Sequence, residues 1–145
     1  MLAFDGEQAV GWCQLTPRAD LGWLDGGARY LARVDEVPVW SLSCFYVRRG
    51  YRDSGVTSIL IDAPLLAARR AGAPAVEAYP IDTSVPGSTK NLFPRAAGTF
   101  ERAGFTTVVR RTPSRPIMRH DLRQSRKRRQ VGPVSMHPMP SVILV

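Results

Sequence analysis

The sequence has few of the residues that build disulfide frameworks and metal centres. Its 145 residues include only two cysteines and two histidines. Cys13 and Cys44 each lie in an apolar, strand-like run, so we expect both to be small buried side chains rather than disulfide partners. His120 and His137 lie far from them in the sequence and form no ligand pattern with them, which predicts that the chain binds no metal.

Long apolar stretches are also missing. No run approaches the roughly 18 residues that a membrane-spanning helix needs, and residues 1–6 lack the basic start and apolar core of a signal peptide. We therefore expect a cytoplasmic protein without a membrane partner. The chain is 44% apolar and 22% charged, an ordinary composition for a soluble protein, and its length suits one domain.

Acidic residues are in the minority, and the net charge is +8. Much of the excess positive charge comes from residues 119–129, which contain six basic residues and one acidic residue, Asp121. The basic residues are Arg119, Arg123, Arg126, Lys127, Arg128 and Arg129. No aromatic residues interleave with these charges, as they do in many nucleic-acid-binding segments. Nucleic-acid binding through this basic tail is therefore a less favoured alternative. Because residues 123–145 also contain three prolines and no apolar periodicity, we expect them to be disordered.

Apolar periodicity divides the remainder, residues 1–122, into strands and helices. The expected strands are residues 8–15, 38–47, 75–79, 105–111 and 116–122, and the expected helices are residues 56–71 and 92–103. Residues 16–36 are expected to be a loop with a short helical turn near residues 28–32. Pro64 predicts a kink or a break in the first helix. Strands that alternate with helices and finish in a hairpin predict an α/β fold of the α+β type, with a mixed sheet and helices on its faces.

Residues 47–57 are the segment with the clearest chemical signal. An apolar strand ends at Val47, a loop with several arginines follows, and a helix is expected to begin near Val56. Free N–H groups at a helix start carry partial positive charge and are a common phosphate site. Gly55 has no Cβ that would keep an anion away from the backbone. A basic loop before a helix is also common as a plain solvated connection, so the residues alone leave both interpretations open.

This segment resembles motif A of the GNAT family of N-acetyltransferases. Arg52, Gly55 and Thr57 fall on the motif positions, and Val47 ends the preceding strand as in the family. Residues 71–80 resemble the family's next helix end and strand, and residues 100–105 resemble motif B, a helix that ends in a Gly-Phe pair. The resemblance covers about residues 8–122 and lacks the family's first strand and following helices. It therefore implies an N-terminally truncated GNAT fold.

The resemblance also implies a co-substrate, acetyl-CoA, and a set of residues that bind it: Phe45, Tyr46, Val47, Arg52, Asp53, Ser54, Gly55, Val56 and Thr57. The acetyl group would pass to an amine of unknown identity, which attacks the thioester directly. Glu77 is the first choice for the general base and Tyr79 for the acid, although a surface carboxylate and a packed aromatic ring are the simpler interpretations. A chain that binds acetyl-CoA without turnover is an alternative function, and a homodimer is one option for its assembly.

Overall fold

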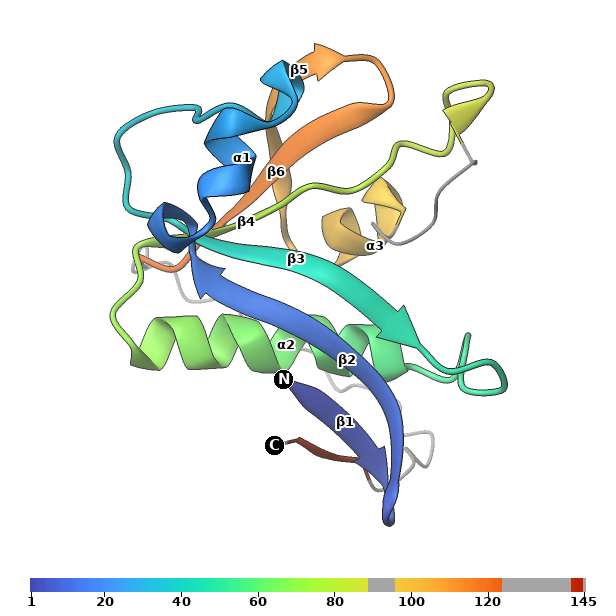
Figure 1. Cartoon of the computed structure of the whole chain (residues 1–145). Coiled ribbons are helices and arrows are strands. Elements are labelled where there is room, and N and C mark those ends of the chain that lie inside the picture. Colours follow the sequence, from blue (N-terminus) through green and yellow to red (C-terminus); the bar gives the residue numbers. More distant parts are fainter. Residues whose placement is uncertain (89–95, 124–141, 145) are drawn as a thin grey trace, which may run out of the picture.

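One mixed sheet forms the centre of the protein (Figure 1). The computed structural model describes residues 1–88, 96–123 and 142–144. In these residues seven strands pair in the order β5-β6-β4-β3-β2-β1-β7. Their bounds are β1 Leu2–Asp5, β2 Gln8–Pro17, β3 Trp40–Val47, β4 Ala75–Ala78, β5 Thr106–Thr112, β6 Arg115–Asp121 and β7 Val142–Leu144. The pair β3–β4 is parallel and the other pairs are antiparallel.

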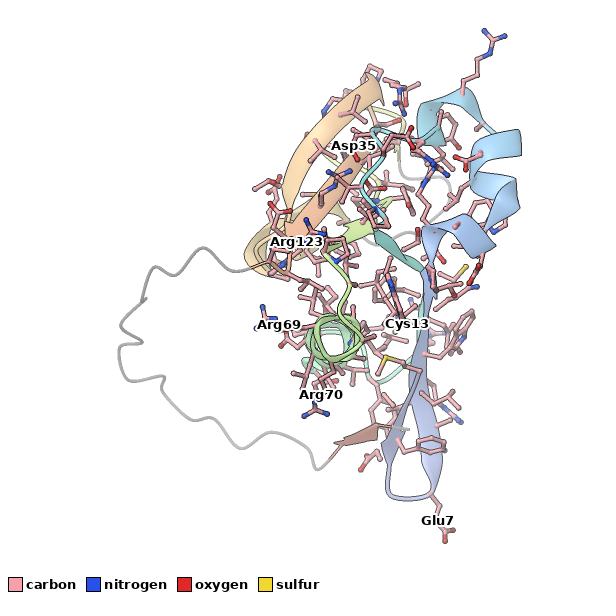
Figure 2. All side chains as sticks on the ribbon, turned by 90° about the vertical axis from the view of Figure 1, so that its left-hand side faces the viewer. Glu7, Cys13, Asp35, Arg69, Arg70 and Arg123 are labelled. Carbon is pink, nitrogen blue, oxygen red and sulfur yellow. The ribbon has the colours of Figure 1, made fainter. Side chains whose placement is uncertain are left out.

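Helices cover both faces of the sheet. The longest, α2 (Val56–Arg70), lies behind β2 and β3 in Figure 1, whereas α1 (Gly22–Gly26) lies in front, and Figure 2 shows the two on opposite sides of the sheet. The short α3 (Ala97–Arg102) follows β4, and two 3₁₀ turns, η1 (Arg18–Asp20) and η2 (Arg29–Leu31), flank α1. None of the described helices is long and apolar enough to cross a membrane.

The core lies between α2, α3 and the sheet. The buried face of α2 repeats with helical spacing through Val56, Leu60 and Ala68, whereas Arg69 and Arg70 point away from the sheet in Figure 2. Phe100 of α3 is 2% exposed. Its ring meets two further rings edge to face: Phe45 at 5.6 Å and Phe105 at 5.3 Å between centroids. Burial of such a side chain contributes about 1.5–3 kcal/mol, which fixes α3 against β3.

The sheet and both main helices were expected from the sequence, but several boundaries differ. Residues 2–5, for which no element was expected, form β1. The helix expected at residues 92–103 begins at Ala97, and residues 89–95 lie outside the described part. Ala96 is extended, with ψ at 140°, because Ala97 donates its N–H to the carbonyl of Ile81 at 2.8 Å and not to a preceding helical turn.

Two expectations about loops and breaks also need correction. Residues 16–36 contain η1, α1 and η2, of which only η2 matches the helical turn expected near residues 28–32. Of the kink or break expected at Pro64, the break does not occur, because α2 is continuous from Val56 to Arg70; the kink stays a prediction. Pro64 is buried in this helix, so contact of its ring with the core offsets the hydrogen bond that it lacks.

The C-terminal residues are described only in part. Residues 124–141 and 145, including most of the expected disordered tail, lie outside the described residues. Val142–Leu144, which we also expected to be disordered, form β7 and pair with β1 in an antiparallel ladder. A strand edge offers unpaired backbone donors and acceptors, and a short apolar strand can satisfy them even when the sequence around it has no periodicity.

Gly11 of β2 lies where α2 packs closely on the sheet. A Cβ at this position would lie 2.9 Å from the carbonyl oxygen of Tyr46 and 2.9 Å from a methyl carbon of Leu60. We expect Gly11→Ala to lower the free energy of unfolding by about 1–3 kcal/mol through overpacking. The matched control is Gly22→Ala, whose Cβ meets no atom within 4 Å. Urea denaturation of the two variants measures the difference, and equal stabilities would contradict this packing.

Candidate functional site

The parallel strands β3 and β4 separate soon after they meet. Only three residue pairs join them, of which the last is Leu42 and Ala78. Beyond this pair β3 continues to Val47, whereas the chain after β4 leaves the ladder at Tyr79 and Pro80. Residues 43–47 therefore have no strand partner on their β4 side within the described part of the chain. Their backbone N–H and C=O groups on that edge can bond an extended ligand.

A β-bulge lies where the two strands separate. Cys13 of β2 pairs with Phe45 and Gln14 pairs with Ser43, so Cys44 is an extra residue in β3. Its φ is +43°, in the left-handed region, which is uncommon for a residue other than glycine. A bulge bends its strand and redirects side chains. Cys44 is consequently exposed and not buried as we expected, whereas Cys13 is buried.

A cavity of about 200 Å³ occupies the space between the separating strands. Residues 42–45 of β3 form one side, and Tyr79 and Pro80 form another. Phe100 of α3 closes it from the helix side. Trp23, Leu31 and Arg115 complete the lining from the segment between β2 and β3 and from the start of β6. The lining is mostly apolar with a few polar groups, which is typical of a small-molecule site.

The N-terminus of α2 follows the far end of β3. Residues 48–55 form the connecting loop, and Gly55 precedes the helix with a φ of +86°. No side chain caps the first turn of α2, so its N–H groups point to the exterior with their partial positive charge. Arg52, Asp53 and Ser54 are exposed beside this turn, and Val56 is buried below it.

Glu77 of β4 is the most buried acidic residue near the cavity, with 1% of it exposed. One carboxylate oxygen accepts hydrogen bonds from Arg119, at 2.7 Å from Nη2 and 3.2 Å from Nε. The other lies 3.9 Å from Nη1 of Arg18. Two guanidinium groups therefore balance one buried carboxylate. Glu77 does not line the cavity itself.

Tyr79 connects this buried carboxylate to the cavity. Its hydroxyl accepts a hydrogen bond from Arg18 at 2.8 Å, lies 2.8 Å from the hydroxyl of Ser41 and donates to Glu77 at 3.3 Å. Burial and, to a lesser degree, the negative charge of Glu77 raise the pKa of Tyr79 to about 12. The phenol therefore keeps its proton throughout the physiological pH range.

Solved structures share this arrangement of strands and helices. An acetyltransferase assigned to the GNAT family from Desulfovibrio desulfuricans is 16% identical with a TM-score of 0.56, over 83% of this chain and 66% of that chain. The CoA-dependent acyl-homoserine lactone synthase BjaI is 19% identical with a TM-score of 0.58, over 85% and 57%. The chain has a GNAT fold. No family model matches the sequence, and no curated protein matches it either.

A third structure agrees with this assignment of the fold. A Corynebacterium glutamicum structure, described as histone acetyltransferase HPA2 and related acetyltransferase, is 23% identical with a TM-score of 0.50, over 80% of this chain and 59% of that chain. This chain therefore spans between 57% and 66% of the length of the three GNAT-like chains. The GNAT fold and the mixed sheet expected from the sequence are both confirmed.

The GNAT fold brings together some of the predicted cofactor-binding residues. Arg52, Asp53, Ser54, Gly55, Val56 and Thr57 all lie at the N-terminus of α2. On β3, Phe45 and Val47 are buried at 4% and 2% exposure, whereas Tyr46 is 44% exposed and adjoins Trp12 on β2, away from the cavity. Tyr46 and Val47 could therefore reach a cofactor in the cavity through their backbone groups alone. The assignment of these residues to a cofactor stays a prediction.

Sequence reasoning missed several residues that shape the site, among them Arg18, Trp23 and Arg119. Arg18, with 4% of it exposed, was assigned to a loop, and Trp23 was not singled out. Arg119 was placed in the strand expected at residues 116–122 and counted with the basic stretch, without the partners that it bonds, Asp35 at 2.8 Å and Glu77 at 2.7 Å. The bonds to Asp35 raise the pKa of Arg119, against the opposing effect of desolvation, and those to Glu77 add to the rise. No sequence signal marks these partners, because they are up to 84 positions apart.

Because Glu77 pairs with two arginines in the interior, we expect its substitution to lower the stability of the fold strongly. Glu77→Gln removes the charge that balances two guanidinium groups, so we expect the free energy of unfolding to fall by about 3 kcal/mol. The matched control is Glu36→Gln, because Glu36 is 93% exposed and, among the described residues, pairs with Arg33 alone at the surface. We expect a change below about 0.5 kcal/mol there. Urea denaturation at pH 7 that gives equal losses for both variants would contradict the buried pairing.

Proposed function

We propose that this protein binds acetyl-CoA and transfers its acetyl group to an amine. One observation carries the proposal: the unpaired backbone edge of residues 43–47 leads from the cavity to the uncapped N-terminus of α2. An extended thioester arm with a diphosphate at its far end fits these two features in this order. The GNAT fold supports the same assignment, since BjaI was solved with isopentyl-CoA.

The diphosphate would bind at the loop before α2. The first-turn N–H groups supply hydrogen bonds and partial positive charge, and Arg48, Arg49 and Arg52 add full charges from exposed positions nearby. Gly55 places no side chain against this turn, and no atom lies within 4 Å of the position of an added Cβ. The pantetheine arm would then pair with the edge of β3, and the thioester would reach the bulge at Cys44.

The reaction follows from this placement. The nitrogen of a neutral amine attacks the thioester carbonyl carbon, the N–C bond forms, and the C–S bond breaks. Backbone N–H groups beside the Cys44 bulge stabilise the negative charge that develops on the carbonyl oxygen. Tyr79 donates its phenol proton to the departing sulfur, and the proton that the amine releases restores the phenol. Glu77 bonds the hydroxyl of Tyr79 and does not line the cavity, and its role as the general base stays a prediction.

Binding of acetyl-CoA without turnover is the second candidate. Glu77, the candidate general base, does not line the cavity, and this observation favours a protein that binds the cofactor without a base placed to take the proton of the amine. Free thiol release in the presence of acetyl-CoA and a panel of amines separates the two candidates. Binding with no thiol release from any amine would favour the second.

Gly55 provides the test of the cofactor site. We expect Gly55→Glu to weaken acetyl-CoA binding at least about tenfold, because a carboxylate would face the diphosphate where like charges repel. The matched control is Gly72→Glu at the other end of α2. Gly72 also has a positive φ, +78°, and no atom within 4 Å of an added Cβ, so the backbone strain and the charge change are similar. Equal losses of affinity for both variants in isothermal titration would contradict binding of the diphosphate at the N-terminus of α2.

Tyr79 provides the test of the chemistry. We expect Tyr79→Phe to lower kcat by about 10²–10⁴-fold, the usual contribution of an acid or base, with an unchanged Kd for acetyl-CoA. Since the pKa of Tyr79 is about 12, the donor form is fully present at neutral pH and is lost only as the pH rises through 12. The wild-type rate should therefore show no alkaline loss up to about pH 10. A kcat for Tyr79→Phe within twofold of the wild type would exclude this role.

A further inference from the structure

The wall of the cavity opposite α3 comes from the segment between β2 and β3. Trp23 of α1 and Leu31 of η2 both line the cavity. Two arginines hold this segment by its backbone: Arg18 donates to the carbonyl of Leu31 at 2.8 Å, and Arg111 of β5 donates to the carbonyl of Ala32 at 2.6 Å. The first bond braces the segment internally and the second joins it to β5 of the sheet. A wall held in this way is preformed, and a preformed wall selects its ligand by shape at low entropic cost.

Arg115 is the one charged side chain among the described residues that line this cavity. Its guanidinium lies over the ring of Tyr30, with Cζ 5.9 Å from the ring centroid. Within residues 1–88 and 96–123, Arg18, Arg33, Arg110 and Arg119 form ion pairs with acidic side chains, whereas none joins Arg115 to an acid. A stacked guanidinium keeps its planar set of donors in a fixed orientation, and this geometry matches a carboxylate.

The position of α1 separates Trp23 from the cofactor side of the cavity. The loop before α2 follows the Val47 end of β3, and Figure 1 shows α1 above the opposite end of that strand. A cofactor whose diphosphate lies at α2 would bring its thioester to Cys44 from the loop side. Trp23, Leu31 and Arg115 then remain for the second substrate. With about 200 Å³, the cavity is below the roughly 300–1,000 Å³ of sites for drug-sized ligands.

We infer that the acceptor is an amino-acid-sized amine with a carboxylate, which Arg115 binds, and an apolar side chain, which Trp23 and Leu31 contact. This inference rests on the proposed function and specifies its substrate class. The carboxylate and the apolar side chain together fix the orientation of the molecule, so that its amine faces the bulge at Cys44. A polyamine or a simple alkylamine lacks the anionic group that Arg115 recognises, and a polar side chain leaves the apolar wall without a partner.

The experiment compares acceptors that differ only in the carboxylate. L-phenylalanine is tested against L-phenylalaninamide and phenethylamine at saturating acetyl-CoA, and free thiol release gives kcat/KM. We expect the carboxylate to favour L-phenylalanine about 10- to 100-fold, the usual effect of a charge-assisted hydrogen bond. In Arg115→Gln this preference should fall to near one, with the Kd for acetyl-CoA unchanged. The matched control is Arg69→Gln, which changes an arginine at the far end of α2 and should keep the preference.

A second measurement does not depend on turnover. Isothermal titration compares N-acetyl-L-phenylalanine with N-acetylphenethylamine, and we expect only the first to bind measurably and to lose its affinity in Arg115→Gln. Equal use or equal binding of the carboxylated and uncarboxylated molecules by the wild type would overturn the inference while acetyl-CoA still binds. Failure of the wild type to bind acetyl-CoA would instead overturn the proposed function, and the two failures are therefore distinguishable.

Discussion

The arrangement of the site depends on one buried carboxylate. Glu77 is 1% exposed and is balanced by Arg18 from the segment after β2 and by Arg119 from β6. Removal of an unpaired charge from water costs several kcal/mol, so each partner is stable in this position only when the others are present. The interaction therefore requires β4, β6 and the segment after β2 to take their places together, and it holds the hydroxyl of Tyr79, a residue that lines the cavity.

The same interaction extends to the cavity wall. Arg119 of β6 also bonds Asp35, which ties the segment between β2 and β3 to the sheet. Arg18 braces the same segment internally, because it also bonds Asp25 and the carbonyl of Leu31. The segment has little regular structure of its own and would otherwise be free to move. Its order therefore comes from charge pairing together with the burial of Leu21 and Leu24. This origin explains how a wall with a half-exposed Trp23 can keep a definite shape.

Elements with strong local patterns could be predicted from the sequence, and those that depend on distant partners could not. The apolar run of β3 and the helical spacing of α2 identified both elements from the sequence, and the Gly55 segment was correctly placed between them. The roles of Arg18 and Arg119 depend on Glu77, which lies 59 and 42 positions away, so neither has a local signal. The bulge at Cys44 was missed because an extra residue in an apolar run leaves the run apolar. The start expected for α3 was wrong at Ala96, which is extended and bridges to Ile81, a partner that no local pattern marks.

The opening between β3 and β4 is a consequence of the contacts that stabilise the sheet. For its hydroxyl to bond Arg18 and lie against Ser41, Tyr79 leaves the ladder after Ala78. Pro80 then has no N–H with which to resume a parallel ladder. If the two strands stayed paired to the end of β3, the backbone groups of residues 43–47 would form hydrogen bonds with β4, and the cavity would close. The buried charge cluster and the open edge are thus two results of the same short strand, so a change that removes the cluster should also alter the cavity.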